Sequence, residues 1–328
     1  MVNRATARAL KSALNHPMRA ARAARSIALQ GRPAIYCTFG GGVGDSLLCG
    51  SVLQELLLRN PNRRVWLEVP AQHLALFGGY PRGAVIVGMG GLHGRLSEAI
   101  GASVKWLGYD DGDLASDVWA VPQRHLFQIM CEKAGIGGTV TLLPRVHLSD
   151  VERSGGKRMA KIQIAIHSSG LGAAHPMRNK EWQADKFQAV VDAVSSDKIG
   201  FVQIGVASDP LLANTLDLRG RLSLRETAAV LSRSAVFVGL VGGLMHLARS
   251  VDCRSVIIYG GREHPWQSGY AANENIAWFG ECAPCWAYSR CDFDRRCMKE
   301  LSATAVSEAV QRQLVRMGAP LPVDQFSV

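Results

Sequence analysis

Short apolar runs alternate with segments of helical periodicity along the first half of the chain. The runs that predict strands are Ala34–Thr38, Arg64–Val69, Ala84–Val87 and Val104–Leu107. Asp45–Arg59 and Pro122–Ala134 instead repeat their apolar residues at helical spacing, which predicts helices. Strands that alternate with helices are typical of βαβ units and a parallel sheet.

The same pattern begins again after a polar stretch at Ser149–Lys161, which we take as the domain boundary. The second series of predicted strands is Ile162–His167, Gly200–Ile204, Ala235–Leu240 and Ser255–Tyr259. The predicted helices of this series are Ala184–Ser195, Leu224–Leu231, Gly243–Val251 and Ala303–Val315. We therefore expect an α/β protein with two Rossmann-like, doubly wound domains, at residues 34–150 and 160–328. They should face each other across a cleft at the carboxyl ends of their strands.

The composition is that of a globular protein with sizeable cores, because 48% of the 328 residues are hydrophobic and 20% are charged. This balance excludes disordered, collagen-like and disulfide-scaffold chains. The net charge of +10 is concentrated near the N-terminus. Residues 1–44 hold seven basic residues and no acidic one, so the other 284 residues carry 30 basic against 27 acidic side chains. A nearly neutral body argues against nucleic-acid binding.

Residues 4–30 of the basic segment have helical character, with a break at His16-Pro17. We expect a helical arm over residues 1–33 that lies on an anionic membrane, and so a cytoplasmic protein peripheral to the inner face of the cytoplasmic membrane. A solvated helix packed on the domain explains the same pattern, and an Arg-rich, acid-free N-terminus is also typical of transit peptides. The longest mostly apolar stretch, Ser234–Ala248, is too short to span a membrane.

A glycine-rich turn, Gly40–Gly44, connects the first predicted strand to its helix and places Asp45 in the first helical turn. It lacks the third glycine of the dinucleotide-binding fingerprint and the Gly-Lys of a phosphate-binding loop. Such a turn lets the backbone approach a ligand closely. Asp45 is then either a residue of the site or only a cap of the helix, since carboxylates stabilise helix N-termini.

Two further segments suit a phosphate-bearing ligand. Gly242-Gly243 follows a buried strand and opens a helix, whose free N–H groups and positive dipole end form a ready phosphate site. His246, about one turn into that helix, either packs there or reaches the phosphate. Arg178-Asn179-Lys180 follows the first strand of the second half, where its basic residues either neutralise a diphosphate or form a solvated loop.

The eight cysteines fall into two groups. Four are scattered in apolar contexts and are predicted to lie reduced in the cores: Cys37, Cys49, Cys131 and Cys253. The others lie within 16 residues in a C-x2-C-x5-C-x5-C pattern: Cys282, Cys285, Cys291 and Cys297. Four thiolates suit a Zn or Fe ion, which would be structural because no coordination position stays open. Free or reversibly oxidised thiols are the alternative.

In order and spacing, these segments resemble the bacterial heptosyltransferase family, glycosyltransferase family nine, from about Ala34 to about Val310. The resemblance rests on Gly44-Asp45 with Pro61, Lys180-Glu181-Trp182, Asp217–Gly220 with Ser223-Leu224, Gly242–Ala248, and the cysteine segment that ends at Cys297-Met298. It implies the GT-B arrangement of two Rossmann-like domains. It also implies metal-independent transfer, with inversion, of a heptose or related sugar from a nucleotide diphosphate, typically ADP, to lipopolysaccharide or another surface glycan.

The resemblance implies roles for single residues as well. Asp45 matches the proposed general base, which takes the proton of the attacking acceptor hydroxyl. Lys180 matches the family's phosphate-contacting lysine, and the helix start at Gly242, Gly243 and His246 matches its phosphate-binding helix. Further donor contacts fall at Ser169, Asp209 and Leu222, and sugar or acceptor contacts at Gly44, Arg262 and His264.

One segment departs from the family pattern. Val241-Gly242-Gly243 stands where many members have Asp-Ser/Thr-Gly, so a carboxylate and a hydroxyl contact to the donor are lost and the nucleotide base is left open. Two alternatives to the enzyme described above therefore remain. One is a catalytically weak or silent homologue that binds a sugar nucleotide or a glycan. The other is a glycosyltransferase that modifies a protein.

Overall fold

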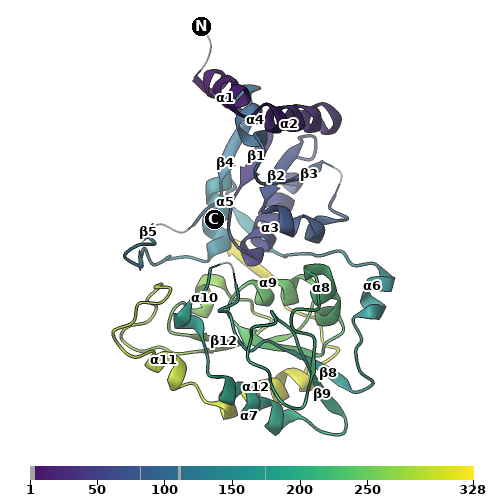
Figure 1. Cartoon of the computed structure of the whole chain (residues 1–328), viewed down its shortest axis with the longest axis vertical. Helices are drawn as coiled ribbons and strands as arrows, with labels where there is room; N and C mark the ends of the chain where they lie inside the picture. The colour runs from purple at the N-terminus through teal and green to yellow at the C-terminus, as the bar shows by residue number, and fades with distance from the viewer. Residues whose placement is uncertain (1–3, 82, 110–111, 174) are drawn as a thin grey trace.

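The computed structural model describes residues 4–81, 83–109, 112–173 and 175–328, and it divides into two α/β halves (Figure 1). The N-terminal half is built on a parallel sheet in the order β3-β2-β1-β4. Its strands are β1 (Ile35–Thr38), β2 (Val65–Val69), β3 (Ala84–Gly88) and β4 (Ser103–Trp106). The helices around it are α1 (Arg4–Asn15), α2 (Pro17–Gln30), α3 (Val43–Arg59), the 3-10 helix η1 (Ala71–Phe77), α4 (His93–Ala99) and α5 (Leu126–Ala134).

The two faces of this sheet are covered by different helices, because successive strand residues point to opposite sides. Cys37 and Leu67 belong to the core under α3 and α5. Their neighbours Tyr36 and Trp66 point the other way, where Ile27 of α2 packs on them. The N-terminal arm is therefore docked on the outer face of the sheet, and α1 and α2 both contact α4.

The C-terminal half contains a larger parallel sheet in the order β10-β9-β8-β11-β12-β13. Its strands are β8 (Ile162–Ile166), β9 (Ile199–Gln203), β10 (Thr215–Asp217), β11 (Val236–Leu240), β12 (Ser255–Gly260) and β13 (Glu274–Ala277). The main helices are α7 (Ala184–Val194), α8 (Leu224–Ser232), α9 (Gly243–Ser250) and α12 (Ala303–Val315). Shorter ones are α6 (Asp150–Gly155), the 3-10 turn η2 (Arg178–Lys180), α10 (Pro265–Ser268) and α11 (Arg296–Lys299).

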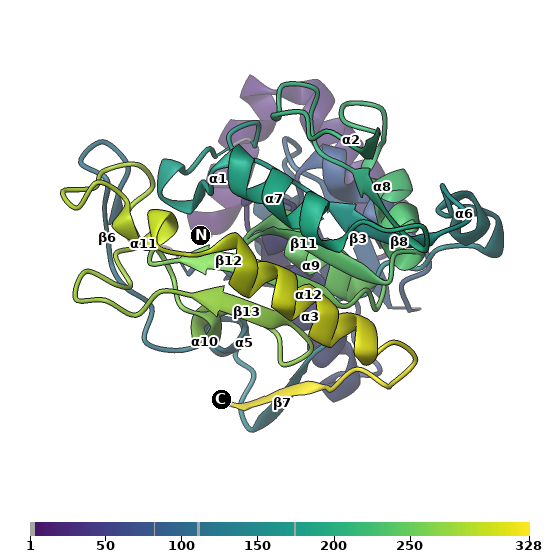
Figure 2. The same ribbon diagram turned by 90° about the horizontal axis from the view of Figure 1, so that it is seen from below.

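This sheet is buried on both faces. Phe187 of α7 and Val310 of α12 pack with Val238 on one side, and α8 and α9 cover the other side (Figure 2). Strands β11 and β12 are buried along their whole length, as expected of parallel strands between two helical layers. The predicted strands and helices of both halves are confirmed, with ends that differ by a few residues.

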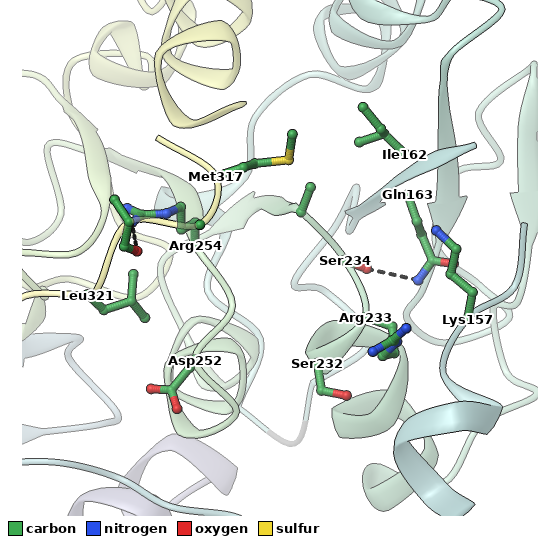
Figure 3. A pocket seen from close by; sticks show the side chains of 13 residues that line it. Lys157, Ile162, Gln163, Ser232, Arg233, Ser234, Asp252, Arg254, Met317 and Leu321 are labelled. Carbon is green, nitrogen blue, oxygen red and sulfur yellow. Dashed lines mark hydrogen bonds between the residues drawn. The ribbon is translucent and has the colours of Figure 1, made fainter. Parts of the chain in front are cut away.

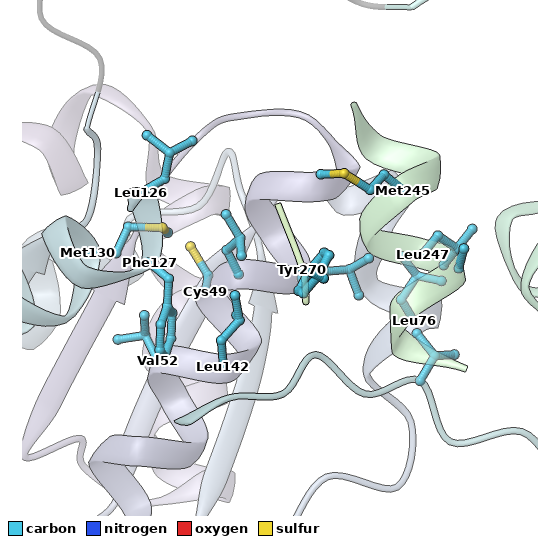
Figure 4. Close-up of a cluster of buried hydrophobic side chains, with 14 of the residues drawn as sticks. Cys49, Val52, Leu76, Leu126, Phe127, Met130, Leu142, Met245, Leu247 and Tyr270 are labelled. Carbon is cyan, nitrogen blue, oxygen red and sulfur yellow. The ribbon is translucent and has the colours of Figure 1, made fainter. Parts of the chain in front are cut away.

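A single apolar core joins the two halves. It combines Cys49 and Val52 of α3 and Phe127 of α5 with Met245 and Leu247 of α9 (Figure 4). The last strand, β14 (Asp324–Ser327), returns to the N-terminal half and pairs antiparallel with β7 (Thr139–Leu142). A hairpin of β5 (Gly112–Asp113) and β6 (Val118–Trp119) extends from the N-terminal half. In the part of the chain that the structure describes, no helix is both long and apolar enough to cross a membrane.

Candidate active site

The N-termini of α3 and α9 meet at the boundary between the halves. A Cβ atom placed on Gly44 of α3 would lie 2.5 Å from Cδ2 of His246 and 3.3 Å from the Cα atom of Gly243. Only residues without a side chain allow this approach. Gly242, ahead of α9, has a φ of 157°, a conformation that other residues rarely adopt. The two glycine turns predicted to approach a ligand therefore face one another.

Asp45 lies in the first turn of α3, and two donors orient its carboxylate. Oδ2 accepts a hydrogen bond of 2.7 Å from the backbone N–H of Gly42, and Oδ1 accepts one of 2.5 Å from the Tyr109 hydroxyl. Asp45 thus caps its helix, which is one of the two roles that the sequence predicted for it. Its charge also acts on the ammonium group of Lys180, which belongs to the other half. Asp45 is therefore both a cap and a member of a cluster between the halves.

Lys180 ends the turn η2 and pairs with a buried carboxylate. Its Nζ atom lies 2.7 Å from Oε1 of Glu263, which follows β12 and is almost fully buried. Burial opposes ionisation of Glu263, but the charges of Lys180 and Arg262 hold its pKa below the usual value. Lys180 is thus a buried ion-pair partner. The alternative prediction of a solvated basic loop does not hold for this residue.

Two histidines beside this ion pair are neutral at physiological pH. His246 shares a hydrogen bond of 2.6 Å between Nδ1 and the Tyr270 hydroxyl, and burial lowers its pKa to about 3. Burial lowers the pKa of His125, the N-cap of α5, to about 4. Neutral imidazoles can accept or donate a hydrogen bond to a ligand without adding charge.

The predicted donor contacts lie in loops after the strands of the C-terminal sheet. Ser169 follows β8 and donates a hydrogen bond of 2.9 Å to Glu181. Asp209 follows β9; its Oδ2 lies 3.3 Å from Nε2 of His167 and accepts the N–H of Val206. Leu222 lies just ahead of α8, half-buried against the shared core.

The side chain of Arg262 packs against the cysteine segment. The Arg262 guanidinium stacks over the Trp286 ring, 4.7 Å from its centroid, and over Tyr288 at 5.2 Å. His264 packs on Phe279, with 4.7 Å between ring centroids. Val241 is buried in the shared apolar core, so its side chain serves packing.

Sequence reasoning missed Glu263, Tyr109 and Tyr270. Glu263 had a usable signal, since it follows the carboxyl end of a buried strand in the half where ligands bind in such folds. Tyr109 and Tyr270 carry no local signal, because the residues they contact, Asp45 and His246, are distant along the chain.

The four clustered cysteines line one cavity of about 250 Å³. Burial raises the pKa of the Cys285 and Cys297 thiols, and neighbouring thiols of the cluster add to the effect. Among the residues that the structure describes, no group of three or more His, Cys, Asp or Glu side chains is arranged to hold a metal ion. The other four cysteines are buried and unpaired, as predicted: Cys37, Cys49, Cys131 and Cys253.

The hairpin of β5 and β6 in the N-terminal half contacts the cysteine segment. The Asp117 carboxylate accepts the N–H groups of Tyr288, Ser289 and Arg290 at 2.7–2.8 Å. Trp119 stacks on Tyr288 with ring centroids 4.7 Å apart and planes 7° from parallel. The segment is therefore contacted by residues of both halves.

A second cavity, of about 410 Å³, lies at the opposite end of the C-terminal sheet (Figure 3). Ile162, Ala235 and Arg254 stand at the amino ends of β8, β11 and β12 and line it. Gln163 donates a hydrogen bond of 3.1 Å to Ser234 across this space. None of the predicted site residues lines this cavity.

Comparison with known proteins relates part of the C-terminal half to one family. Residues 170–291 match the family model of glycosyltransferase family 9 (heptosyltransferase). The chain contains a glycosyltransferase family 9 domain. This family 9 domain includes Lys180, His246 and Glu263, and the protein is accordingly a glycosyltransferase. No curated protein sequence matches the chain.

Solved structures of such proteins share the fold. A glycosyl transferase family 9 protein from Veillonella parvula has a TM-score of 0.62 at 16% identity, with 86% of this chain and 97% of that chain covered. The iron-containing dodecameric glycosyltransferase TibC of enterotoxigenic E. coli has a TM-score of 0.69 at 16% identity, covering 86% and 76%. E. coli ADP-heptose lps heptosyltransferase II has a TM-score of 0.64 at 15% identity, covering 87% and 100%. The predicted GT-B architecture is thereby confirmed.

Proposed function

We propose that this glycosyltransferase moves a heptose or related sugar from a nucleotide diphosphate, ADP-heptose by preference, to lipopolysaccharide or another surface glycan. The observation that carries the proposal is the cluster between the halves, where Gly44 contacts the start of α9 and the charge of Lys180 interacts with both Asp45 and His246. The match of residues 170–291 to a heptosyltransferase family supports the sugar. TibC, a relative in fold, was solved in complex with ADP-D-beta-D-heptose, which supports the donor.

The proposed step is a single displacement at the anomeric carbon. The acceptor oxygen forms a bond to this carbon while the carbon's bond to the diphosphate oxygen breaks, and the nucleotide diphosphate leaves with the electron pair. Asp45 takes the hydroxyl proton as the new bond forms. Attack from the face opposite the leaving group inverts the configuration.

The leaving diphosphate needs positive charge, and the C-terminal half supplies it. Lys180 offers an ammonium group, and the positive end of the α9 dipole at Gly242 and Gly243 offers a second source. Preorganised groups of this kind stabilise developing charge without rearrangement. The proposed chemistry therefore uses this chain's own residues and no catalytic metal.

The direct test has two arms that separate an enzyme from a binding homologue. A thermal-shift panel of ADP, GDP, UDP and CDP identifies the nucleotide, because a ligand that binds the folded state raises its melting temperature. Release of nucleotide diphosphate from ADP-heptose with a lipopolysaccharide-core acceptor then measures turnover. ADP stabilisation with turnover supports the proposal. Stabilisation with no turnover of any sugar nucleotide supports a silent binding homologue instead, and turnover with a protein acceptor alone supports the protein-modifying alternative.

We also propose that the N-terminal arm contacts anionic membrane lipids. The helices α1 and α2 expose basic side chains together with apolar ones: Arg8, Lys11, Arg19, Arg22 and Arg25, with Leu14, Met18 and Leu29. This mixture suits a helix lying at a negatively charged lipid surface. It would hold the cytoplasmic enzyme near a lipid-linked acceptor.

We further propose that the four-cysteine segment binds a structural Zn or Fe ion. Thiolates are the ligands that both metals prefer, and the four side chains share one cavity. Since no metal-binding group is already formed among the described residues, metal binding requires the four side chains to rearrange. TibC is iron-containing, which supports iron as one of the two candidates.

A further inference from the structure

Lys180 pairs with one carboxylate and is affected by the charge of a second, and the two carboxylates have different tasks. Asp45 must be available to take a proton from the acceptor, whereas Glu263 already holds the Lys180 ammonium at 2.7 Å. Opposite charges in a buried cluster attract strongly, because little water screens them. Removing the Glu263 charge would therefore leave the buried Lys180 ammonium without its ion-pair partner.

The surroundings of Glu263 favour this holding role. Its charge acts on Lys180 and Arg262, on the neutral imidazoles of His246 and His125, and on the Tyr259 hydroxyl. Its second carboxylate oxygen, Oε2, lies 3.3 Å from Nη1 of Arg262. One carboxylate thus joins two cations, which leaves it ionised even though it is buried.

The cysteine segment fixes the residue next to Glu263. The N–H of Cys285 donates to the carbonyl of Gly261 at 3.2 Å, and the N–H of Trp286 donates to the carbonyl of Arg262 at 2.9 Å. The Arg262 guanidinium is also held by its stacking on Trp286 and Tyr288. A continuous set of contacts therefore leads from the cysteine segment through Arg262 and Glu263 to Lys180.

We propose that Glu263 is a positioning residue that holds the Lys180 ammonium in place for the donor phosphates, and that the cysteine segment sets the place of Glu263 through Arg262. The proposal rests on the proposed function, since it assigns Lys180 to the donor phosphates. It adds a residue whose task is to fix the phosphate-binding cation.

The main test compares Glu263→Gln with the intact chain. Glutamine keeps the shape of the side chain but removes the charge that opposes deprotonation of the buried Lys180. We expect the alkaline limb of the activity profile to move to lower pH by about one unit, and the KM for the donor at pH 8 to rise about tenfold. The matched control is Glu274→Gln, which removes a carboxylate paired with Arg312 and Arg316 on the far side of the same half. An unchanged limb and KM in Glu263→Gln would overturn the proposal.

Rescue separates positioning from a merely structural role. In the double variant Lys180→Arg with Glu263→Gln, the cation stays charged over the whole accessible pH range, so the alkaline limb should disappear. Glu263→Asp retains the charge, so its activity should decrease at the same alkaline pH as that of the intact chain. This variant is used if Glu263→Gln does not fold. A limb that stays at the lower pH in both variants contradicts the proposal.

A measurement without turnover keeps this proposal separate from the proposed function. Titration of 15N-labelled lysine side chains by NMR reports the pKa of Lys180 directly. It should fall in Glu263→Gln, and fall less in Arg262→Lys, which loses the stacking on Trp286. If the intact chain transfers no sugar, the proposed function fails, and the titration still decides the role of Glu263. A Lys180 pKa unchanged in Glu263→Gln would overturn that role.

Discussion

Gly44 and His246 touch across the boundary between the two halves, at the first turns of α3 and α9. A Cβ atom on Gly44 would stand 2.5 Å from the imidazole carbon Cδ2 of His246. His246 is itself held by the Tyr270 hydroxyl at 2.6 Å and cannot retreat without breaking that bond. The contact links the turn that carries Asp45 to the helix that would bind the donor phosphates.

Gly44→Ala should therefore weaken the closed arrangement of the halves. We expect a loss of about 1–3 kcal/mol in the free energy of unfolding, the usual cost of overpacking, and a lower kcat/KM. Urea unfolding with a parallel activity assay measures both. Gly137→Ala is the matched control, because nothing lies within 4 Å of a Cβ atom there. Equal stability and activity in the two variants would show that the Gly44 contact is unimportant.

Asp117→Asn should loosen the cysteine segment. The carboxylate accepts three backbone N–H groups of that segment, and an amide oxygen replaces it only as a neutral acceptor. We expect faster hydrogen exchange at Tyr288, Ser289 and Arg290. Asp113→Asn is the control, since Asp113 caps only the turn of its own hairpin. Unchanged exchange in Asp117→Asn would show that these three hydrogen bonds, which we call the Asp117 clamp, do not hold the segment.

The same carboxylate predicts a pH dependence of this clamp. Burial acts against ionisation of Asp117, but the three N–H donors hold its pKa below the usual value. A lowered pKa means that the clamp contributes stability above the unfolded-state pKa and loses it as the pH falls through the folded-state pKa. The protection factors of residues 288–290, which correct for the slower intrinsic exchange at low pH, should thus fall at acidic pH in the intact chain and show a weaker pH effect in Asp117→Asn.

Anaerobically purified protein should contain about one equivalent of Zn or Fe if the cysteine segment binds metal. Elemental analysis measures it, and Cys285→Ser should lower the content. A metal-free protein under these conditions ends the metal proposal and leaves the thiols as free or reversibly oxidised groups.

The N-terminal arm should bind vesicles that contain phosphatidylglycerol and leave neutral phosphatidylcholine vesicles free. Reversing Arg19, Arg22 and Arg25 to Glu should reduce flotation with anionic vesicles about tenfold or more, because each basic residue near such a surface adds attraction. Reversing Lys157, Lys161 and Lys198, exposed on the C-terminal half, makes the same change of net charge elsewhere. Equal losses in both variants would mean that the arm is not a specific contact.

Much of the fold follows from local patterns in the sequence. The run at Ala235–Leu240 is apolar throughout because β11 is covered on both faces, and the Gly242-Gly243 turn marks the start of α9. The pairing of β14 with β7 could not be predicted, since it joins segments far apart in the chain by backbone contacts that leave no periodic signal. The hairpin at residues 112–119 is too short to show a pattern.

The candidate site was predictable only in part, for the same reason. Asp45 and Lys180 were recognised from their place after glycine turns and strands, together with the family resemblance. Glu263 was passed over in favour of its neighbours Arg262 and His264, because the sequence does not show which way successive loop residues point. In the structure it is Glu263 that faces Lys180.

The central claim is that Asp45 takes the acceptor proton, and the most direct test is the rate of sugar transfer by Asp45→Asn. Asparagine keeps the shape and can still accept a hydrogen bond from Tyr109, but it cannot take the proton. We predict that kcat falls by about 100-fold or more while the affinity for ADP stays unchanged, with Asp192→Asn on the exposed side of α7 as the control. Transfer by Asp45→Asn at the rate of the intact chain would contradict the account.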